Sequence, residues 1–516
     1  MLESMAKRAR SVGRTSLVLL VLVMLLAIVA IASGGPRRTA TQVPSAEPPA
    51  RGLDRVVDDN AKDLLGEGRR VFRFETFGDE AFWGGTLRLH EALKAVTPLQ
   101  ALTPGGVKQG LGLKVDVDAL PNNLIEQLQH GRVDLNDPAL TLALLKLNAV
   151  LGVTGFFDNE GNLTSVGLQC ALCHSTVDNS VTFGVGHRLD GWANRDLDVG
   201  KVIASAPNLE PIASLLSVDV ATVRSVLLSW GPGKFDAELL FDGQPFNPNP
   251  VGVIDHGTVK TVKMPGATLL PNAFGLPGFN QHAWTGAWGT VTYWNALVAN
   301  LELMGIGRFF DPRLFTSQFP IAIKRGVGNQ NPTLDPDNDR ITKNLASLHF
   351  YQLAIPSRKP RPGVDFDQTA ARRGDELFSG KAKCNTCHVE PLWTEPGWNL
   401  HPSDDLQPNS STPPELRIDD FQANRAPLGA FLPNGTPLPN KGNYKTMNLA
   451  GLFVRENGLF MAPENAGRFY HDGRFTTLRD VVISYNVRFA LGLTDDEMNA
   501  LVEYLKSLFS NGSAVD

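Results

Sequence analysis

Two Cys-x-x-Cys-His pentapeptides constrain this 516-residue chain more than any other feature. They read Cys170-Ala-Leu-Cys173-His174 and Cys384-Asn-Thr-Cys387-His388, and they contain every cysteine of the chain. Two thiols at this spacing can bond to one porphyrin edge, and the adjacent histidine then lies under the iron as its proximal ligand. The motifs therefore predict two covalently bound c-type haems, with His174 and His388 as iron ligands.

Two other uses of paired cysteines fit the chain less well. A zinc ribbon also needs two Cys-x-x-Cys pairs, but these pairs lie more than 200 residues apart and each is followed by its own histidine. A redox-active dithiol is expected once, beside a βαβ pattern, and neither motif has that context. We therefore interpret the chain as a di-haem cytochrome c.

The N-terminus has the pattern of an export signal. An uncharged run from Leu17 to Ala32 follows several Lys and Arg residues and ends in an Ala-Ile-Ala site. This pattern predicts that residues 1–33 are a secretory signal peptide or, if retained, a membrane anchor, and that residues 34–55 are a Pro-rich tether. The folded part is then periplasmic or secreted, or it is held at the inner membrane.

Composition limits the partners and the fold class. The net charge is −5 and the isoelectric point is near 6.1, so nucleic acid is not an expected partner. With 49 Gly and 35 Pro, much of the chain is expected to be turn and loop, and the Gly-, Pro- and Asn-rich stretch 230–279 is expected to wrap the surface. Helical periodicity at residues 79–96, 138–150 and 221–230 predicts a mainly α fold.

Helix signals also flank the second motif. Asp367 can cap a helix over residues 368–378, which leads into that motif. Thr494 and Glu497 form a capping box for a last helix, which we expect to extend to Phe509.

The spacing of these features predicts two haem domains of unequal size. We expect an enlarged haem c domain 1 over residues 56–355, a Pro- and charge-rich linker over 356–364, and a cytochrome c domain 2 over 365–516. The first domain is about twice as long as the second for one haem, a length that indicates more than electron storage.

The residues after the second motif resemble a known family. His471-Asp-Gly-Arg-Phe475, followed by Thr477-Leu478, resembles the His-Asp-Gly…Thr-Leu signature of the bacterial di-haem cytochrome c peroxidase superfamily. That superfamily includes the di-haem enzyme that matures methylamine dehydrogenase and the di-haem rubber oxygenases. The chain length and the large first domain resemble the rubber-oxygenase branch more than the compact peroxidases.

The resemblance implies one reactive haem and one six-coordinate relay haem, whose distal ligand comes from the segment after His-Asp-Gly. Peroxidases have Met fourteen residues beyond that His, and this chain has Tyr485 there. A Tyr at this place resembles the maturation enzyme. His471 is the competing iron ligand because imidazole is a better donor, and the iron could instead bind Met447 or Met461 or keep an open site. Tyr485 and His471 could each also be structural.

Two further residues are implied as reactive. Trp284, in His282-Ala-Trp284, resembles the tryptophan that lies between the haems of the superfamily and shortens the electron-tunnelling gap. Glu302 lies near the register of the distal-pocket glutamate that acts as acid–base catalyst on bound peroxide. A tryptophan in an ordinary core and a solvated glutamate on a helix face are the structural alternatives.

Two weaker patterns complete the candidate sites. Arg195 follows the first motif closely and could bind a haem propionate. Asp335-Pro-Asp337-Asn-Asp339 resembles the start of a calcium loop but lacks its Gly and terminal Glu, so an acidic turn is the simpler interpretation.

These features lead to one expected function and two alternatives. We expect an exported oxidoreductase that activates peroxide or O2 at haem 1, with haem 2 as electron relay and with a redox protein or a small molecule as partner. The first alternative is a periplasmic electron-transfer cytochrome with two six-coordinate irons. The second is a maturation factor that oxidises another protein by long-range hole transfer.

Overall fold

The computed structural model describes residues 52–243, 249–264, 267–284, 289–315, 319–326, 329–330, 334–397, 401–402 and 443–515. The expected signal or anchor segment, 1–33, and most of the expected tether lie outside the described residues. The described residues from Asn60 onward belong to one compact unit, Asn60–Asp516.

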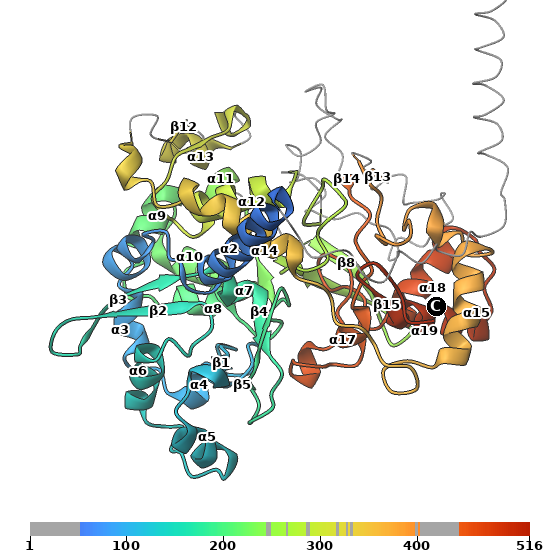
Figure 1. Cartoon of the computed structure of the whole chain (residues 1–516), viewed down its shortest axis with the longest axis horizontal. Coiled ribbons are helices and arrows are strands. Elements are labelled where there is room, and N and C mark those ends of the chain that lie inside the picture. Colours follow the sequence, from blue (N-terminus) through green and yellow to red (C-terminus); the bar gives the residue numbers. More distant parts are fainter. Residues whose placement is uncertain are drawn as a thin grey trace, which may run out of the picture. The chain divides into compact units, whose positions relative to one another are not determined.

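The described residues are mainly α-helical, as predicted (Figure 1). The α-helices are α2 (Leu53–Phe74), α3 (Leu89–Leu93), α4 (Pro98–Leu102), α5 (Asn122–Gln129), α6 (Pro138–Lys146), α7 (Cys170–His174), α8 (Val199–Ala204), α9 (Glu210–Leu216), α10 (Val220–Ser229), α11 (Leu239–Asp242), α12 (Val291–Leu297), α13 (Pro320–Arg325), α14 (Leu345–Ala354), α15 (Gln368–Ser379), α17 (Leu452–Glu456), α18 (Leu478–Arg488) and α19 (Asp495–Ser507). Two π-helical turns are η1 (Ala81–Thr86) and η3 (Val298–Glu302). Short 3-10 turns are η2 (Val117–Ala119), η4 (Pro312–Phe315), η5 (Pro336–Asn338), η6 (Thr342–Asn344), η7 (Cys384–Thr386) and η9 (Pro463–Asn465).

The strands of the described segments pair only two at a time. One pair is parallel, β1 (Val115–Asp116) with β5 (Val185–Gly186). The antiparallel pairs are β2 (Val153–Phe157) with β3 (Leu163–Leu168), β4 (Ser175–Val177) with β6 (Arg188–Asp190), β7 (Lys234–Phe235) with β10 (Thr268–Leu269), β8 (Asn249–Asp255) with β9 (Thr258–Met264), β11 (Phe309–Phe310) with β12 (Asn329–Gln330), β13 (His401–Pro402) with β14 (Asn443–Tyr444), and β15 (Leu508–Phe509) with β16 (Gly512–Ser513).

Capping chemistry sets the predicted helix starts. Asp137 accepts a hydrogen bond from the backbone N–H of Ala139 where α6 begins, and Asp367 accepts one from Ala370 at the start of α15. Thr494 and Glu497 form both hydrogen bonds of a capping box before α19. The helices predicted over 138–150, 221–230, 368–378 and 495–509 are confirmed to within a few residues at their ends.

One expectation was wrong. The segment 79–96, predicted to be one helix, forms the two separate helices η1 and α3. Arg88, which lies between them, has a left-handed backbone (φ 59°) that interrupts the helix. The stretch 230–279 contains the hairpin β8–β9, with a turn at His256-Gly257.

Two large hydrophobic cores hold the compact unit Asn60–Asp516. The first draws on residues between Trp83 and Leu270. The second combines residues on both sides of the expected linker, among them Phe72, Trp192 and Tyr504. The division into domains at 356–364 therefore stays a prediction, since apolar packing continues across it.

Helices α15 and α19 pack closely beside the second motif (Figure 1). A Cβ at Gly374 would lie 2.1 Å from the carbonyl oxygen of Ala500, so only glycine permits this approach. The rings of Phe378 in α15, Tyr504 in α19 and Trp393 pack edge to face against one another. This aromatic cluster supports the chain that follows the second motif.

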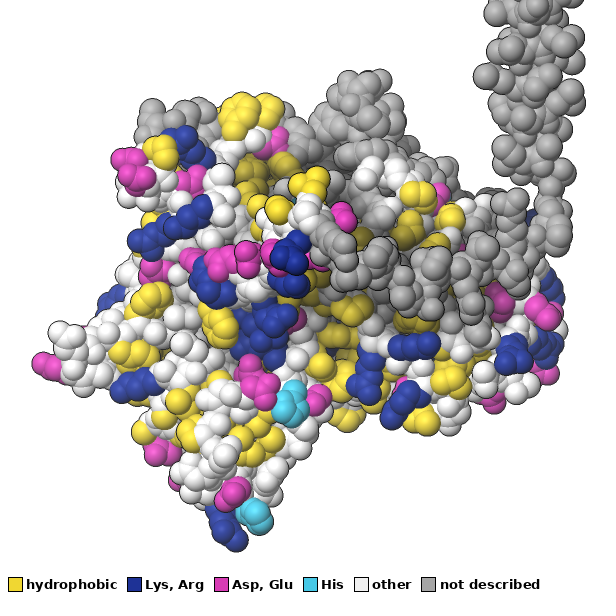
Figure 2. Space-filling model, in the orientation of Figure 1, with side chains coloured by type: hydrophobic (Ala, Val, Ile, Leu, Met, Phe, Trp, Pro, Cys, Tyr) yellow, Lys and Arg dark blue, Asp and Glu magenta, His cyan; other side chains and the backbone are white. Residues whose placement is uncertain are grey.

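On the face shown in Figure 2, Lys and Arg side chains are interspersed with Asp and Glu. Within the described ranges, no single helix has the length and apolar character to cross a bilayer; α9 and α10, bent by 93° relative to each other, meet that test only as a pair, by length and composition.

Candidate functional site

The first motif forms the short helix α7 between strands β3 and β4. Nδ1 of His174 lies 3.0 Å from the carbonyl oxygen of Pro271, a hydrogen bond that requires the proton on Nδ1 and leaves Nε2 as the coordinating atom. Burial lowers the pKa of His174 to about 4, so the imidazole is neutral at pH 7, as an iron ligand must be.

The second motif begins in η7 and repeats this arrangement. Nδ1 of His388 lies 2.9 Å from the carbonyl oxygen of Trp393, and burial lowers the pKa of His388 to about 4. Trp393 is itself fixed, because its indole donates a 3.0 Å hydrogen bond to the carbonyl of Phe509. Both motif histidines thus have the tautomer and orientation of a proximal haem ligand.

The four cysteines are free thiols, and none is paired in a disulfide. Burial raises the pKa of Cys170, Cys173 and Cys384 to about 12, the opposite of the lowered pKa of a reactive dithiol. Paired, half-buried thiols next to a hydrogen-bonded histidine fit covalent haem at both motifs.

One group of donors resembles a metal site. Donor atoms of Cys387, Glu395 and His401 lie within 4.8 Å of one another. A thioether bond from Cys387 to haem would remove the thiolate from this set and leave a His–Glu pair, which is insufficient for zinc. We therefore assign no separate metal here.

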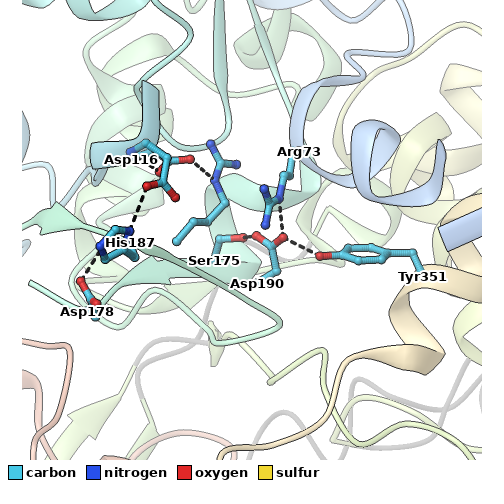
Figure 3. A network of polar contacts seen from close by, with 9 residues as sticks. Arg73, Asp116, Ser175, Asp178, His187, Asp190 and Tyr351 are labelled. Carbon is cyan, nitrogen blue, oxygen red and sulfur yellow. Dashed lines mark hydrogen bonds and ion pairs between the residues drawn. The ribbon is translucent and has the colours of Figure 1, made fainter. Parts of the chain in front are cut away.

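A carboxylate fixes the strand that follows His174 (Figure 3). Asp190 accepts hydrogen bonds from Ser175 Oγ at 2.8 Å, Arg73 Nε at 2.6 Å and the Tyr351 hydroxyl at 2.6 Å. Ser175 is the residue after His174, so α2, α14 and β6 all restrain the proximal side of the first motif.

A three-residue stretch, 269–271, connects three of the predicted site residues. The indole of Trp284 donates a 2.6 Å hydrogen bond to the carbonyl of Leu269. The backbone N–H of Leu269 donates to the carbonyl of His471 at 2.7 Å. Pro271, two residues later, accepts from His174. The structure thus brings Trp284, His471 and His174 to one segment of backbone.

Glu302 ends the π-helical turn η3 beside the first motif. Its Oε1 is buried and has no hydrogen-bond partner among the described residues. Burial, reinforced by the charges of Glu238 and Asp236, raises the pKa of Glu302 to about 8. After burial, the charge of Glu302 is the next cause that raises the pKa of Cys173, and Leu303, the residue after Glu302, packs on the same hydrophobic core as Cys173.

Residues that the sequence did not single out hold Glu302 in place. The indole of Trp83 donates a 2.9 Å hydrogen bond to the carbonyl of Leu303, and Ile306 donates from its backbone to Phe77 at 2.9 Å. Asp79, in the same segment, accepts from the backbone N–H of Leu168 at 3.2 Å, just before the first motif. The segment from Phe77 to Trp83 therefore connects η3 to β3 through hydrogen bonds. No sequence pattern indicated this connection.

Tyr485 lies in α18 beside the second motif. Burial raises its pKa well above the usual range, with further contributions from Tyr470 and from the thiols of Cys384 and Cys387. His471 is 2% exposed and packs on Tyr470, with ring centroids 5.1 Å apart. His471 is therefore buried and Tyr485 half-buried, and Val481, one turn before Tyr485 in α18, packs on the same hydrophobic core as Cys384.

The two candidate methionine ligands lie elsewhere. The backbone of Met447 slightly raises the pKa of His388, against the larger effect of burial. Met447 is thus on the proximal side. Met461 lies between Phe460 and Ala462. The Thr176 hydroxyl donates to the carbonyl of Phe460 at 3.3 Å, and Asp196 accepts from the N–H of Ala462 at 2.9 Å. Thr176 and Asp196 both follow the first motif. Neither placement favours a methionine as distal ligand of the second haem.

Arg195 is 5% exposed, and its Nη1 has no hydrogen-bond partner among the described residues. Its charge contributes, after burial, to the lowered pKa of His174, so it lies near the first motif. A buried guanidinium with an unpaired N–H fits a haem propionate.

The acidic segment at 335–339 behaves as a turn. Asp335 accepts from the backbone N–H of Asp337 at 3.0 Å, and Asp339 accepts from Ile341, Thr342 and Arg308. The carboxylates of Asp335 and Asp339 thus accept hydrogen bonds from backbone N–H groups. These contacts support the acidic-turn interpretation and give no support to calcium.

Comparisons with known proteins give a partial relationship. No family model matches the chain. A cytochrome c peroxidase of Denitromonas iodatirespirans, IdrP1, is 28% identical over 226 residues, which are 38% of this chain and 55% of that protein. The match therefore spans about half the length of the relative. It supports a haem-enzyme relationship, without indicating the branch.

A solved structure of hydrazine synthase from Kuenenia stuttgartiensis, pressurised with xenon, is also similar in part. The similarity covers 47% of this chain and 72% of that chain, at 18% sequence identity and a TM-score of 0.27. A TM-score this low carries no argument about fold or function.

Proposed function

We propose that this protein is an exported di-haem c-type oxidoreductase that reduces peroxide or O2 at the haem of the first motif. The haem of the second motif serves as electron relay. The observation that carries the proposal is an asymmetry: Glu302, with a buried unpaired carboxyl oxygen, lies beside the first motif, whereas Tyr485 lies beside the second.

The chain's residues have distinct tasks in this function. Cys170 and Cys173 hold haem 1, Cys384 and Cys387 hold haem 2, and His174 and His388 are the proximal ligands. The iron, when present, supplies the redox centre at which an O–O bond is reduced. Arg195 neutralises propionate charge.

Glu302 is the acid–base group of the first site. Cleavage of an O–O bond requires a proton at the departing oxygen, and a carboxyl group without other partners can hold that proton at Oε1. A pKa of about 8 places the group near the operating pH, where both proton uptake and release are efficient. The burial that raises this pKa also limits the access of bulk water to Oε1.

Trp284 is the proposed conduit between the sites. Its indole donates a hydrogen bond to the carbonyl of Leu269. The N–H of Leu269 donates to His471, which follows the second motif, and the nearby Pro271 accepts from His174 of the first motif. An indole in this position shortens the electron-tunnelling path. The electrons come from a redox protein or from a small organic substrate, and the peroxidase relative supports the former chemistry.

Export is part of the proposal, because c-type haem is attached outside the cytoplasm. Residues 1–33 would direct it, and the peroxidase relative is consistent with an exported enzyme. Haem-stained denaturing gels of Cys170→Ala and Cys384→Ala test covalent attachment. Each variant should retain about half of the signal per chain, and an unchanged signal in either would reject that attachment site.

The deciding experiment is an optical titration of the reduced holoprotein with carbon monoxide, followed by stopped-flow mixing with peroxide. An open first iron should bind one equivalent of carbon monoxide per chain, whereas an electron carrier with two six-coordinate irons should bind none. Glu302→Gln should slow the peroxide reaction about 100-fold, the usual size of a lost acid–base group, while carbon monoxide binding is retained. Glu376→Gln, an exposed glutamate on α15, is the matched control and should react like wild type.

A further inference from the structure

Two arginines are buried together near the first motif. Arg195 is 5% exposed and Arg455 is 6% exposed. Nη1 of Arg195 and Nε of Arg455 each have no hydrogen-bond partner among the described residues. Burial and then the charge of Arg455 lower the pKa of Arg195 well below its usual value.

The backbone around Arg455 is fixed with respect to Arg195. Asp196 accepts hydrogen bonds from the N–H of Ala462 at 2.9 Å and from Asn465 Nδ2 at 2.8 Å. Gly467 donates to the carbonyl of Arg455 at 2.8 Å. The guanidinium of Arg455 donates to the carbonyl of Arg468 and lies over the ring of Phe469 at 4.7 Å.

The nearby carboxylates do not compensate these charges. Asp196, next to Arg195, is already paired with Lys114 at 2.6 Å and accepts two further hydrogen bonds. Among the described residues, neither Arg195 nor Arg455 forms a salt bridge. Like charges buried together with unpaired N–H groups are strongly unfavourable unless an anion lies between them.

We propose that Arg195 and Arg455 form one anion-binding site, and that its ligand is the pair of propionate carboxylates of haem 1. This inference rests on the proposed function. Two guanidinium groups offer planar forks that bind carboxylates in a bidentate way, and two carboxylates neutralise two cations. Asn194, the residue before Arg195, donates its backbone N–H to the carbonyl of Cys173 at 2.9 Å, so the site adjoins the first motif.

The consequence is a dependence of haem 1 on the C-terminal half of the chain. Arg455 lies in α17, far in sequence from Cys170 and Cys173. A haem bonded to those cysteines would be held by Arg455 at its opposite edge. The environment of the first haem would thus depend on a residue beyond the second motif.

The test uses the full-length holoprotein and the variants Arg455→Gln and Arg455→Lys. Arg372→Gln, an exposed arginine on α15, is the matched control. Resonance Raman spectra report the propionate bending bands, and a redox titration reports the two midpoint potentials. Arg455→Gln should shift one set of propionate bands and lower one midpoint potential, because a nearby cation favours the reduced haem. The other potential should stay unchanged, Arg455→Lys should show a smaller shift, and Arg372→Gln none.

Three outcomes would overturn the proposal. Unchanged propionate bands and potentials in Arg455 variants with wild-type haem content would exclude the ligand. If added inorganic phosphate shifts a potential of the wild type but not of Arg455→Gln, while the bands do not change, the anion is free in solution and the proposal is wrong. If Arg455→Gln does not fold, Arg455→Lys and Arg195→Lys provide the same measurements. A wild-type chain without haem staining would reject the proposed function itself, and this ligand with it.

Discussion

The indole of Trp83 donates a 2.9 Å hydrogen bond to the carbonyl of Leu303, the residue that follows Glu302. Trp83 lies in the π-helical turn η1, and Glu302 ends the π-helical turn η3. Such turns are uncommon and occur often at functional sites. The hydrogen bond joins the two turns, so the position of the Glu302 carboxyl depends on a residue more than 200 positions away in sequence.

Trp83→Phe is expected to impair the first site without removing a group that reacts. Phenylalanine keeps most of the buried ring but lacks the N–H, so η3 loses one restraint and the carboxyl of Glu302 is less well placed. The rate of the peroxide reaction should fall about 10-fold, and the pH at which the rate is half-maximal should shift. Haem content and the spectrum of the second haem should not change.

Trp294→Phe is the matched control for this experiment. The indole N–H of Trp294 has no hydrogen-bond partner among the described residues, so its loss breaks no bond. Equal rates in Trp83→Phe and wild type, or an equal loss in both variants, would show that the bond to Leu303 does not position Glu302.

Asp79 should make the protein less stable as the pH rises. Burial raises its pKa to about 9, and the nearby charges of Glu80 and Glu75 act in the same direction. Its folded pKa lies above its unfolded pKa of about 3.9, so the folded state binds the extra proton between these values. The contribution to stability is complete below about pH 4 and is lost progressively toward pH 9.

Asp79→Asn removes this dependence and keeps an oxygen for the N–H of Leu168. The free energy of unfolding at pH 8 should rise by about 2 kcal/mol, and its slope between pH 5 and 9 should become shallower. Denaturant titrations at several pH values measure both quantities. Exposed Asp54→Asn, in the first turn of α2, serves as the control. A wild-type stability that increases over this range would contradict the assignment.

The sequence predicted the features that rest on local chemistry. Helix caps such as Asp367 and Thr494 act on backbone groups within three residues, so their signals are contained in short segments. The Cys-x-x-Cys-His motifs are equally local, because one turn of chain contains both thiols and the imidazole. The positions of these elements could therefore be derived without a structure.

The connections between the candidate sites could not be derived in this way. The acceptors for His174, His388, Trp284 and Trp83 are all backbone carbonyls, of Pro271, Trp393, Leu269 and Leu303. Every residue type carries such a carbonyl, so no side chain marks the partner in the sequence. Arg455 was missed for a related reason: an arginine is usually exposed, and only the fold shows that this one is buried.

The ion pair of Lys114 and Asp196 should be important for stability. Both side chains are 0% exposed, and Nζ lies 2.6 Å from Oδ2. Lys114→Met would leave the Asp196 charge buried and without its cation, which should cost about 3–5 kcal/mol of unfolding free energy. In the double variant Lys114→Met/Asp196→Asn no unpaired charge remains, and part of the loss should be recovered. Denaturant unfolding measures all three proteins.

The exposed pair Lys381–Glu497 provides the comparison. Its lysine side chain is 40% exposed, and solvent screens the charges, so Lys381→Met should cost no more than about 1 kcal/mol. Similar losses in Lys381→Met and Lys114→Met would show that the buried pair has no special role.

The identity of the second haem's distal ligand can be decided by two substitutions. Tyr485 lies in α18, where the thiols of Cys384 and Cys387 contribute to its raised pKa. If Tyr485 is the ligand, Tyr485→Phe should convert one six-coordinate iron to a five-coordinate iron. Electron paramagnetic resonance of the ferric protein should then lose one signal, while His471→Ala changes the spectrum only slightly.

If His471 is the ligand, the pattern inverts, because imidazole gives a low-spin ferric haem whose signal disappears in His471→Ala. Tyr504→Phe is the control, since Tyr504 is buried in α19 and its ring packs on Phe378. A low-spin signal that survives both substitutions would reject both residues. The ligand would then be sought among Met447 and Met461, although the backbone of Met447 adjoins His388 on the proximal side and the neighbours of Met461 bond to the chain after the first motif. A methionine ligand would also require a higher midpoint potential for the second haem than tyrosine or histidine gives, so the redox titration provides an independent decision between these outcomes.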